Sequence, residues 1–204
     1  MVAIVDYGVG NLFSLGCSLR KIGAAAEVTG DPDRIRAADR ILLPGVGAFG
    51  DAMEKLRNAG LVPVLREAAA EGRPLLGVCL GMQLLFEKSF EYGEHAGLGL
   101  LPGEVRDLRE GLGESGLKVP HMGWNSLEFP KPDPLFRYVS PGEYVYYVHS
   151  YAARNCDESV LAVSQYGPLA VTGAAGRGNV RGTQFHPEKS GDTGLRILKA
   201  FAEL

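Results

Sequence analysis

The chain has 204 residues, 46% of them hydrophobic and 22% charged, which is typical of a globular protein long enough to bury a full core. Its formal net charge of -3 comes from 21 basic and 24 acidic residues that are interspersed, so we expect no surface for nucleic acid or for an anionic membrane. The sequence shows no apolar run that could span a bilayer and no signal-peptide pattern at its start, which predicts a cytoplasmic location.

In the first half of the chain, short apolar runs alternate with helical patterns, which indicates βα units and a largely parallel sheet. Buried strands are expected at Val2–Asp6, Arg40–Leu43 and Pro74–Val78. Asn11 can cap the first helix, which should end at Gly23. The predicted helices repeat apolar residues every three or four positions, at Leu12, Leu15, Leu19 and Ile22, at Phe49, Met53 and Leu56, and at Leu61, Val64, Leu65 and Ala68.

The second half favours strands joined by short turns that contain glycine. These strands are expected at Glu143–His149, Leu161–Gln165, Leu169–Ala174 and Asn179–His186, before a closing helix with Leu195, Leu198 and Phe201. The polar segment 107–116 predicts an exposed loop. We therefore expect one α/β domain over residues 1–204, with an open, largely parallel sheet, helices on both faces and antiparallel hairpins that extend the sheet.

A candidate nucleophile follows the third predicted strand. Residues 74–83 read PLLGVCLGMQ, in which Cys79 stands between Gly77 and Gly81 where strand gives way to helix. This GxCxG pattern is the cysteine form of a nucleophile elbow, a tight turn whose neighbours must lack side chains. A helix beginning there favours the thiolate and supplies N–H donors. A buried cysteine between packing glycines explains the pattern equally well, so the choice depends on finding a base.

The chain offers four histidines as that base, namely His95, His121, His149 and His186. Catalytic groups in open α/β sheets gather beyond the carboxyl ends of strands, which favours the last two. Only His186 has a neighbouring carboxylate, Glu188, and Pro187 favours extended backbone that puts both on one side. Such a carboxylate fixes the imidazole tautomer and stabilises the imidazolium. Alone, HPE is more typical of a turn, but together with the elbow it predicts a triad of Cys79, His186 and Glu188.

Attack on an amide carbonyl places negative charge on its oxygen, so the site also needs an oxyanion hole. The N–H of Leu80, beside the nucleophile, is one candidate donor. A second is expected at Val46 or Gly47 in the loop 44–47, where two glycines let the backbone turn an N–H towards the site. The same loop is also typical of a plain strand-to-helix turn, and the two interpretations are compatible.

The motifs favour neither a nucleotide cofactor nor a metal. DYGVGN at 6–11 follows a strand and opens a helix, but Phe13 occupies the third glycine position of GxGxxG, and no GxxxxGK[ST] loop occurs. Metal-ligand spacing is also absent. Cys17 and Cys156 belong to no CxxC pair and are expected to be free, structural thiols in a reducing compartment.

Together these motifs resemble those of the class I glutamine amidotransferases, whose oxyanion loop, nucleophile elbow and late HPE segment occur in this order over the whole chain. Within that family, five segments are similar to the glutaminase subunits of imidazole glycerol phosphate synthases, namely DYGVGN at 6–11, PGVGAF at 44–49, HMGWN at 121–125, YYVHSY at 146–151 and FHPEKS at 185–190. The resemblance implies the class I glutamine amidotransferase fold.

The resemblance further implies that Cys79 attacks the side-chain amide of glutamine and that His186 gives a proton to the departing ammonia. Water then hydrolyses the glutamyl thioester with His186 as base, which yields glutamate. The amino acid end of the substrate should be held by Gln83, Glu91 and backbone at His149, Ser150 and Tyr151. A histidine packed within its strand is an alternative interpretation of His149.

The implied partner is a (β/α)8-barrel cyclase, which uses the ammonia to make imidazole glycerol phosphate and an aminoimidazole carboxamide ribotide in histidine biosynthesis. The two subunits would form a heterodimer through which ammonia passes unprotonated. The positions matched to the interface are Asn11, His121, Trp124, Asn125 and Tyr146. Trp124, the only tryptophan, fits an interface centre and a core equally well. In this family the free glutaminase is nearly idle, and the loop 45–47 is thought to take its oxyanion-binding form when the partner has bound its substrate.

Two other functions are compatible with parts of the pattern. A stand-alone thiol hydrolase, or a glutaminase for another synthase such as one for pyridoxal or aminodeoxychorismate, would share the triad but not the HMGWN and YYVHSY segments. A silent regulatory subunit would bind glutamine and a partner without turnover, and the intact triad argues against it.

Overall fold

The structure, a computed structural model, describes all 204 residues. Its strands are β1 (Val2–Val5), β2 (Ala26–Thr29), β3 (Arg40–Gly45), β4 (Leu75–Cys79), β5 (Phe86–Ser89), β6 (His95–Ala96), β7 (Leu101–Asp107), β8 (His121–Ser126), β9 (Tyr144–His149), β10 (Tyr151–Arg154), β11 (Val160–Tyr166), β12 (Leu169–Arg177) and β13 (Val180–Thr183). Its α-helices are α1 (Leu12–Lys21), α2 (Pro32–Ala37), α3 (Phe49–Asn58), α4 (Leu61–Ala70), α5 (Leu80–Gln83), α6 (Arg109–Leu112) and α7 (Gly191–Ala202). None of these helices has the length and apolarity that crossing a bilayer requires.

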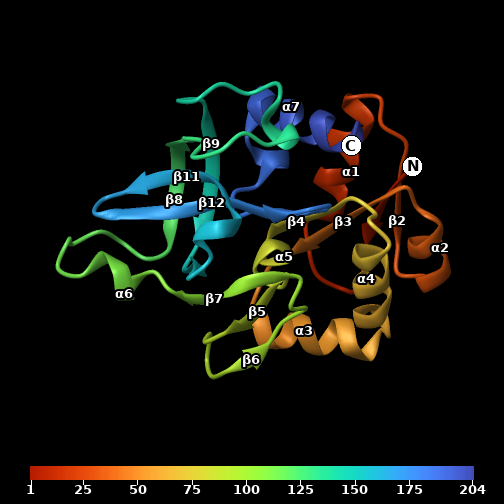
Figure 1. Cartoon of the computed structure of the whole chain (residues 1–204), viewed down its shortest axis with the longest axis horizontal. Coiled ribbons are helices and arrows are strands. Elements are labelled where there is room, and N and C mark those ends of the chain that lie inside the picture. Colours follow the sequence, from red (N-terminus) through yellow and green to blue (C-terminus); the bar gives the residue numbers. More distant parts are fainter.

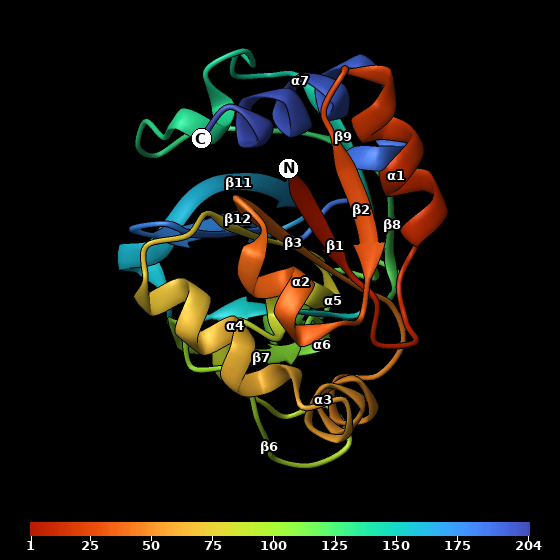
Figure 2. The ribbon, with the colours of Figure 1, turned by 90° about the vertical axis from the view of Figure 1, so that its right-hand side faces the viewer.

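A seven-stranded sheet with the order β11-β12-β13-β4-β3-β1-β2 forms the centre of the molecule. The five strands from β13 to β2 are parallel, and the antiparallel strands β11 and β12 extend one edge. Helices α1 and α7 cover one face, and α2, α3 and α4 cover the other (Figures 1 and 2). The predicted fold class, a largely parallel sheet extended by hairpin strands and covered on both faces, is confirmed.

Each face of the central sheet has its own hydrophobic core. Along β1, Ala3 and Val5 point into a cluster with α3 and α4, whereas Val2 and Ile4 point into a cluster with α1 and α7. Successive strand side chains alternate between faces, so a strand covered on both sides must be apolar throughout. This explains why the three continuously apolar runs of the first half were recognisable as β1, β3 and β4.

Two smaller sheets flank the central one. The first has the order β10-β7-β5-β6, and the second pairs β8 with β9. The prediction that residues 143–149 extend the central sheet is therefore wrong. Their partner is residues 121–126, whose short HMGWNS pattern, interrupted by Gly123 at φ +137°, is no clear strand signal. In Figure 1 this hairpin lies beside β11, which it contacts.

Three local predictions also differ from the structure. The strand expected at Asn179–His186 ends at Thr183. Gln184 N–H still bonds to Gly173 on β12, but His186 N–H bonds to the Tyr146 carbonyl on β9, outside the central sheet. Asn11 occupies the position before α1, but its side chain makes no capping bond. Segment 107–116 is not wholly exposed, because α6 buries two leucines, at 108 and 112, against Ala152, Leu169 and Val171.

The sequence prediction omitted β2 and α2. Helix α2 does carry a recognisable start, since Asp31 accepts a hydrogen bond from the N–H of Asp33 at 2.8 Å and Pro32 occupies the first helical position. Strand β2 is only partly buried on the edge of the sheet, which weakens its apolar pattern.

The junction between β4 and α5 leaves no room for side chains beside the nucleophile candidate. A Cβ atom on Gly81 would lie 1.9 Å from the carbonyl oxygen of Leu43, and one on Gly77 would lie 2.5 Å from the carbonyl oxygen of Gly81. We predict that Gly81→Ala lowers the free energy of unfolding by about 2 kcal/mol or more, because the added methyl group must push β3 and α5 apart. Urea denaturation measures this change.

The matched control is Gly16→Ala in α1, whose Cβ would meet the Arg20 guanidinium at an ordinary 3.5 Å. We expect this variant to be neutral or slightly stabilised, since alanine favours helix. Equal unfolding midpoints for the two variants would contradict the packing argument.

Candidate active site

Cys79 lies at the last position of β4, where the chain turns into α5. Its backbone adopts φ 56° and ψ -112°, a conformation that is uncommon outside glycine. The helix behind it is a single turn, Leu80–Gln83. Pairing of β3 with β4 sets Gly45 opposite Cys79, so the loop 44–47 begins beside the sulfur.

His186 and Glu188 form a buried pair next to this cysteine. His186 Nδ1 lies 2.8 Å from Glu188 Oε1, and the two side chains are 4% and 0% exposed. His186 has the extended backbone that Pro187 favours, but residues 187–189 form a 3-10 turn. The contact is thus present, although an extended stretch through Glu188 is the wrong explanation for it.

The charge state of His186 follows from these neighbours. Burial disfavours the imidazolium, but hydrogen bonds to Cys79 and Glu188, together with their negative charges, outweigh burial and raise the pKa of His186 to about 9. Nδ1 is engaged by Glu188, so Nε2 is the nitrogen that can exchange a proton with Cys79. The Cys79 sulfur itself lies 3.9 Å from the carbonyl oxygen of Val148. At neutral pH the arrangement therefore favours an imidazolium beside Cys79.

Asn11 supports the carboxylate of this pair. Its Nδ2 donates to Glu188 Oε1 at 3.4 Å, while Oε2 of the same carboxylate is buried without a partner. The sequence analysis matched Asn11 to the partner interface. In the structure the side chain reaches across from the start of α1 to the end of the HPE segment, which explains why it does not cap its own helix.

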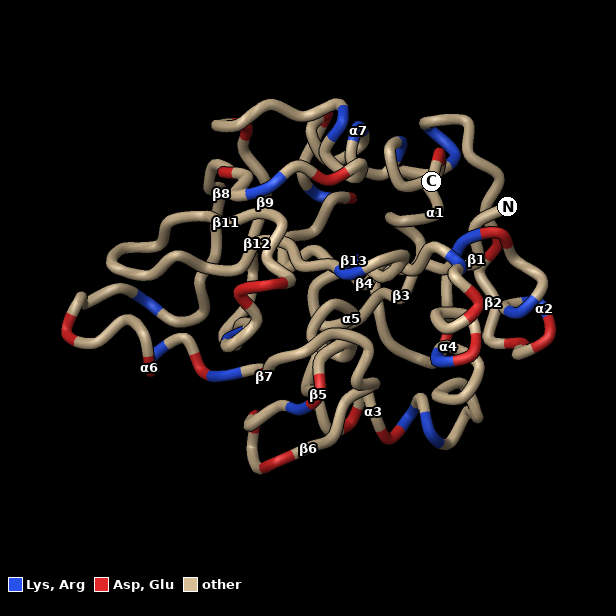
Figure 3. The backbone as a smooth tube through the Cα atoms, viewed as in Figure 1, with Lys and Arg blue, Asp and Glu red and all other residues tan.

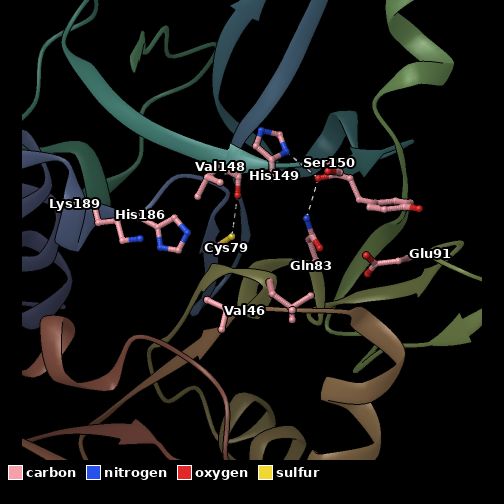
Figure 4. Close-up of a pocket in the computed structure, with 12 residues that line it drawn as sticks. Val46, Cys79, Gln83, Glu91, Val148, His149, Ser150, His186 and Lys189 are labelled. Atoms are coloured by element: carbon pink, nitrogen blue, oxygen red, sulfur yellow. Dashed lines mark hydrogen bonds between the residues drawn. The ribbon is translucent and has the colours of Figure 1, made fainter. Parts of the chain in front are cut away.

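A cavity of about 340 Å³ opens onto Cys79 and His186 (Figure 4). All the predicted oxyanion, substrate-binding and catalytic residues except Glu188 line it, namely Val46, Gly47, Cys79, Leu80, Gln83, Glu91, His149, Ser150, Tyr151 and His186. Val148 and Lys189 also line it and were not predicted. Residues from the loop after β3, from β4, α5, β9 and β10, and from the HPE turn thus converge on one cavity.

Hydrogen bonds fix several of the lining groups. Gln83 Nε2 donates to the Tyr151 carbonyl at 2.9 Å and to Gln184 Oε1 at 3.0 Å. Gln184 Nε2 in turn lies 3.8 Å from the sulfur of Cys79. Glu91 accepts the N–H of Phe49, the first residue of α3, at 2.7 Å, and burial raises the pKa of its carboxyl. Gln184 was missed because it carries no motif of its own.

Tyr7 is a second residue that the sequence reasoning did not single out. Its buried hydroxyl donates to the carbonyl of Pro44 at 2.7 Å and so ties the start of the loop 44–47 to β1. Burial raises the pKa of this phenol, and the nearby Cys79 adds to the shift. Gly10 packs on the same proline, and a Cβ atom at position 10 would lie 2.9 Å from Pro44 Cβ. This contact explains the glycine in DYGVGN, so a bound nucleotide is not needed to explain it.

The positions matched to a partner interface do not all lie on the surface. Trp124 is 53% exposed and meets the Tyr146 ring edge-on at 5.9 Å, in an apolar face of β8–β9 that also includes exposed Met122 and Tyr144. His121, in contrast, is 1% exposed. Strands β8, β9 and β11 carry no Lys, Arg, Asp or Glu, and the β11 segment is tan in Figure 3.

We predict that His186 stays protonated well above the ordinary range of histidine, and that Cys79→Ala lowers its pKa. The variant removes the hydrogen bond and the charge that oppose burial. Since the folded-state pKa lies above the unfolded value, this group stabilises the fold below about pH 6.5, and that contribution is lost as pH rises through about 9. NMR titration of the histidine rings measures both values. An unchanged His186 pKa in Cys79→Ala would refute the coupling.

Comparison with known proteins identifies the family. The model of the family described as glutamine amidotransferase class-I matches residues 3–203. A Wolinella succinogenes protein named imidazole glycerol phosphate synthase subunit HisH is 52% identical over 205 residues, which cover all of both chains. The subunit of the same name from Moorella thermoacetica is 52% identical over 204 residues, covering 100% of this chain and 94% of the relative.

Solved structures agree in fold. A crystal structure of a glutamine amidotransferase superposes with a TM-score of 0.75 at 21% identity, covering 100% of this chain and 99% of the other. The structure of PurLQS from Thermotoga maritima gives the same TM-score and identity over 99% of this chain and 97% of its own. The chain therefore belongs to the class-I glutamine amidotransferase family, among the relatives named as the HisH subunit of imidazole glycerol phosphate synthase.

Proposed function

We propose that the chain hydrolyses glutamine to glutamate and ammonia through a thioester on Cys79, and that the ammonia serves a synthase partner in making imidazole glycerol phosphate for histidine biosynthesis. The observation that carries this proposal is the buried pair of His186 and Glu188 beside Cys79, at the floor of a cavity of about 340 Å³. Relatives at 52% identity are named as the corresponding synthase subunit.

In the first half of the reaction, the Cys79 sulfur attacks the side-chain carbonyl carbon of glutamine. We assign the negative charge that develops on the carbonyl oxygen to backbone N–H groups at Leu80 and at Val46 or Gly47, residues that line the cavity. As the tetrahedral intermediate collapses, the C–N bond breaks and His186 transfers its proton to the leaving nitrogen. Ammonia departs and a glutamyl thioester remains on Cys79.

In the second half, a water molecule attacks the thioester carbonyl while His186, now neutral, takes its proton. The C–S bond breaks, glutamate is released, and the thiolate and imidazolium are restored. Glu188 keeps the ring in one orientation throughout, because it holds Nδ1 and leaves Nε2 to exchange the proton.

The amino acid end of glutamine is assigned to the other side of the cavity. Glu91 presents a carboxylate there, one oxygen of which is engaged by Phe49 N–H, so the other can accept the substrate ammonium group. Gln83 and the backbone at 149–151 complete this side of the pocket. The cavity thus separates the reacting amide from the charged end.

The partner is assigned as a (β/α)8-barrel cyclase that forms a heterodimer with this chain. The exposed apolar face of β8–β9, with Trp124 and Tyr146, supports this assignment because aromatic residues favour interface centres. We further assign residues 1–204 to one domain and the chain to the cytoplasm, where its three cysteines would stay free thiols.

We predict that Cys79→Ala reduces glutamine-dependent synthesis by the complex at least about 1,000-fold, because no other group can form the thioester. Synthesis supplied with ammonium salt should remain within about twofold of the unsubstituted complex. Product formation from each nitrogen source measures the two activities. Loss of both would refute the division of labour between the subunits.

A second prediction concerns the interface. Trp124→Ala should weaken binding of the cyclase about tenfold or more without lowering the unfolding midpoint, since the side chain is 53% exposed. Isothermal titration calorimetry measures the affinity. Val28→Ser, at an exposed position of edge strand β2, is the control and should bind as the unsubstituted chain does. Equal affinity for both variants would exclude the β8–β9 face as the docking site.

A further inference from the structure

A chain of hydrogen bonds runs from β8 into the substrate pocket. At its pocket end, the carbonyl oxygen of Tyr151 accepts two bonds, from Gln83 Nε2 at 2.9 Å and from His149 Nδ1 at 2.8 Å. Figure 4 shows the two dashed lines meeting at this oxygen from opposite sides. Both lone pairs of the carbonyl are therefore engaged, and the position of Gln83 depends on His149.

The partners of His149 determine which of its nitrogens carries hydrogen. A carbonyl can only accept, so Nδ1 of His149 must be the protonated nitrogen. Burial lowers the pKa of His149 to about 3, which keeps the ring neutral and leaves Nε2 as an acceptor. Nε2 faces His121 Nδ1 at 3.0 Å, so His121 Nδ1 carries a hydrogen and donates it.

Asn125 determines whether the other nitrogen of His121, Nε2, carries hydrogen. The amide nitrogen of Asn125 donates to the Gln165 carbonyl at 2.9 Å, which fixes the orientation of the amide. Its oxygen therefore faces His121 Nε2, at 2.7 Å, and an amide oxygen can only accept. Every contact in the chain is satisfied only when both nitrogens of His121 carry hydrogen, that is, when the ring is an imidazolium.

The surroundings of His121 suit such a cation. Its ring is stacked between Tyr147 and Tyr166, with centroid distances of 4.8 and 4.0 Å. The faces of aromatic rings attract a cation. The titratable groups that face it are His149 and Tyr147 from β9 and Tyr166 from β11. Burial lowers the pKa of His121, and the bond to Asn125 opposes that shift.

We propose that His121 is a positioning residue of the glutaminase site. As an imidazolium held by Asn125, it donates to Nε2 of His149, holds that ring against the Tyr151 carbonyl and so keeps Gln83 in place. The inference rests on the proposed function and extends it, because β8 also carries Trp124, next to Asn125. When His121 loses its second proton, two acceptors meet either at Asn125, at 2.7 Å, or at His149, at 3.0 Å, so one of these contacts opens and the support of the pocket loosens.

The first test needs no variant. Long-range 15N–1H NMR correlation of the histidine rings in the unsubstituted chain reports which nitrogens carry hydrogen. We expect His149 to show the Nδ1–H tautomer, and His121 to carry hydrogen on both nitrogens at the pH of the glutaminase assay. A neutral His121 ring under the assay conditions, or an Nε2–H tautomer of His149, would overturn the proposal.

The second test is kinetic and uses the complete complex with saturating cyclase. His121→Phe keeps a flat ring between the two tyrosines and removes both hydrogen bonds. We expect the KM for glutamine to rise about tenfold and kcat to change less than about twofold, because Gln83 belongs to the substrate-holding side of the pocket. In the same variant, the 15N chemical shift of His149 Nε2 should move, because that nitrogen loses its donor.

Asn179→Leu is the matched control for a purely structural loss. It also removes two side-chain hydrogen bonds, to the carbonyls of Ala69 and Arg73, but at the far ends of β4 and β13. We expect its KM to stay unchanged. Equal KM values for His121→Phe and the unsubstituted chain would overturn the positioning role. A complex of unsubstituted chains without glutamine turnover would instead refute the proposed function, and the NMR tautomers would still decide on His121.

Discussion

The close approach of β3, β4 and α5 at Cys79 is the constraint on which the rest of the site depends. The turn forces Cys79 into an uncommon backbone conformation, and it can form only because Gly77 and Gly81 bring no side chains into the contact. The same contact aligns Gly45 with the cysteine. One packing requirement therefore places the buried Cys79 at the wall of the cavity, starts α5 directly behind it and positions the loop 44–47 beside it.

The smaller sheets hold the rest of the site. After β13 the chain leaves the central sheet, and His186 N–H bonds to the Tyr146 carbonyl on β9. His186 is thus tied to two sheets. It follows β13 of the parallel sheet that carries Cys79, and its backbone bonds to the hairpin whose exposed face carries Trp124. A partner that shifts the hairpin would act on His186 and, through His149, on Gln83. This arrangement gives a physical basis for coupling between partner binding and turnover.

The sequence predicted those features that depend on local pattern. Continuous apolar runs identified the buried strands, and the elbow and HPE motifs identified Cys79 and His186 before any geometry was known. Features that depend on pairing between distant segments could not be read in the same way. The β8–β9 hairpin, the contact of Gln184 with the cysteine, and the burial of His121 each arise from residues at least 18 positions apart. Asn11 is a further example. Its side chain bonds to the distant Glu188 in place of the capping bond that the local sequence predicts.

The central claim is that this chain is a glutaminase whose activity is controlled by a cyclase. The most direct test measures glutamate release from glutamine by the chain alone, and then with the barrel cyclase and its ribonucleotide substrate. The account predicts slow release by the isolated chain and stimulation of about 100-fold or more in the complete mixture. High activity that is indifferent to the cyclase would contradict the control by a partner and the assigned pathway, and no release under any condition would contradict the catalytic role of Cys79.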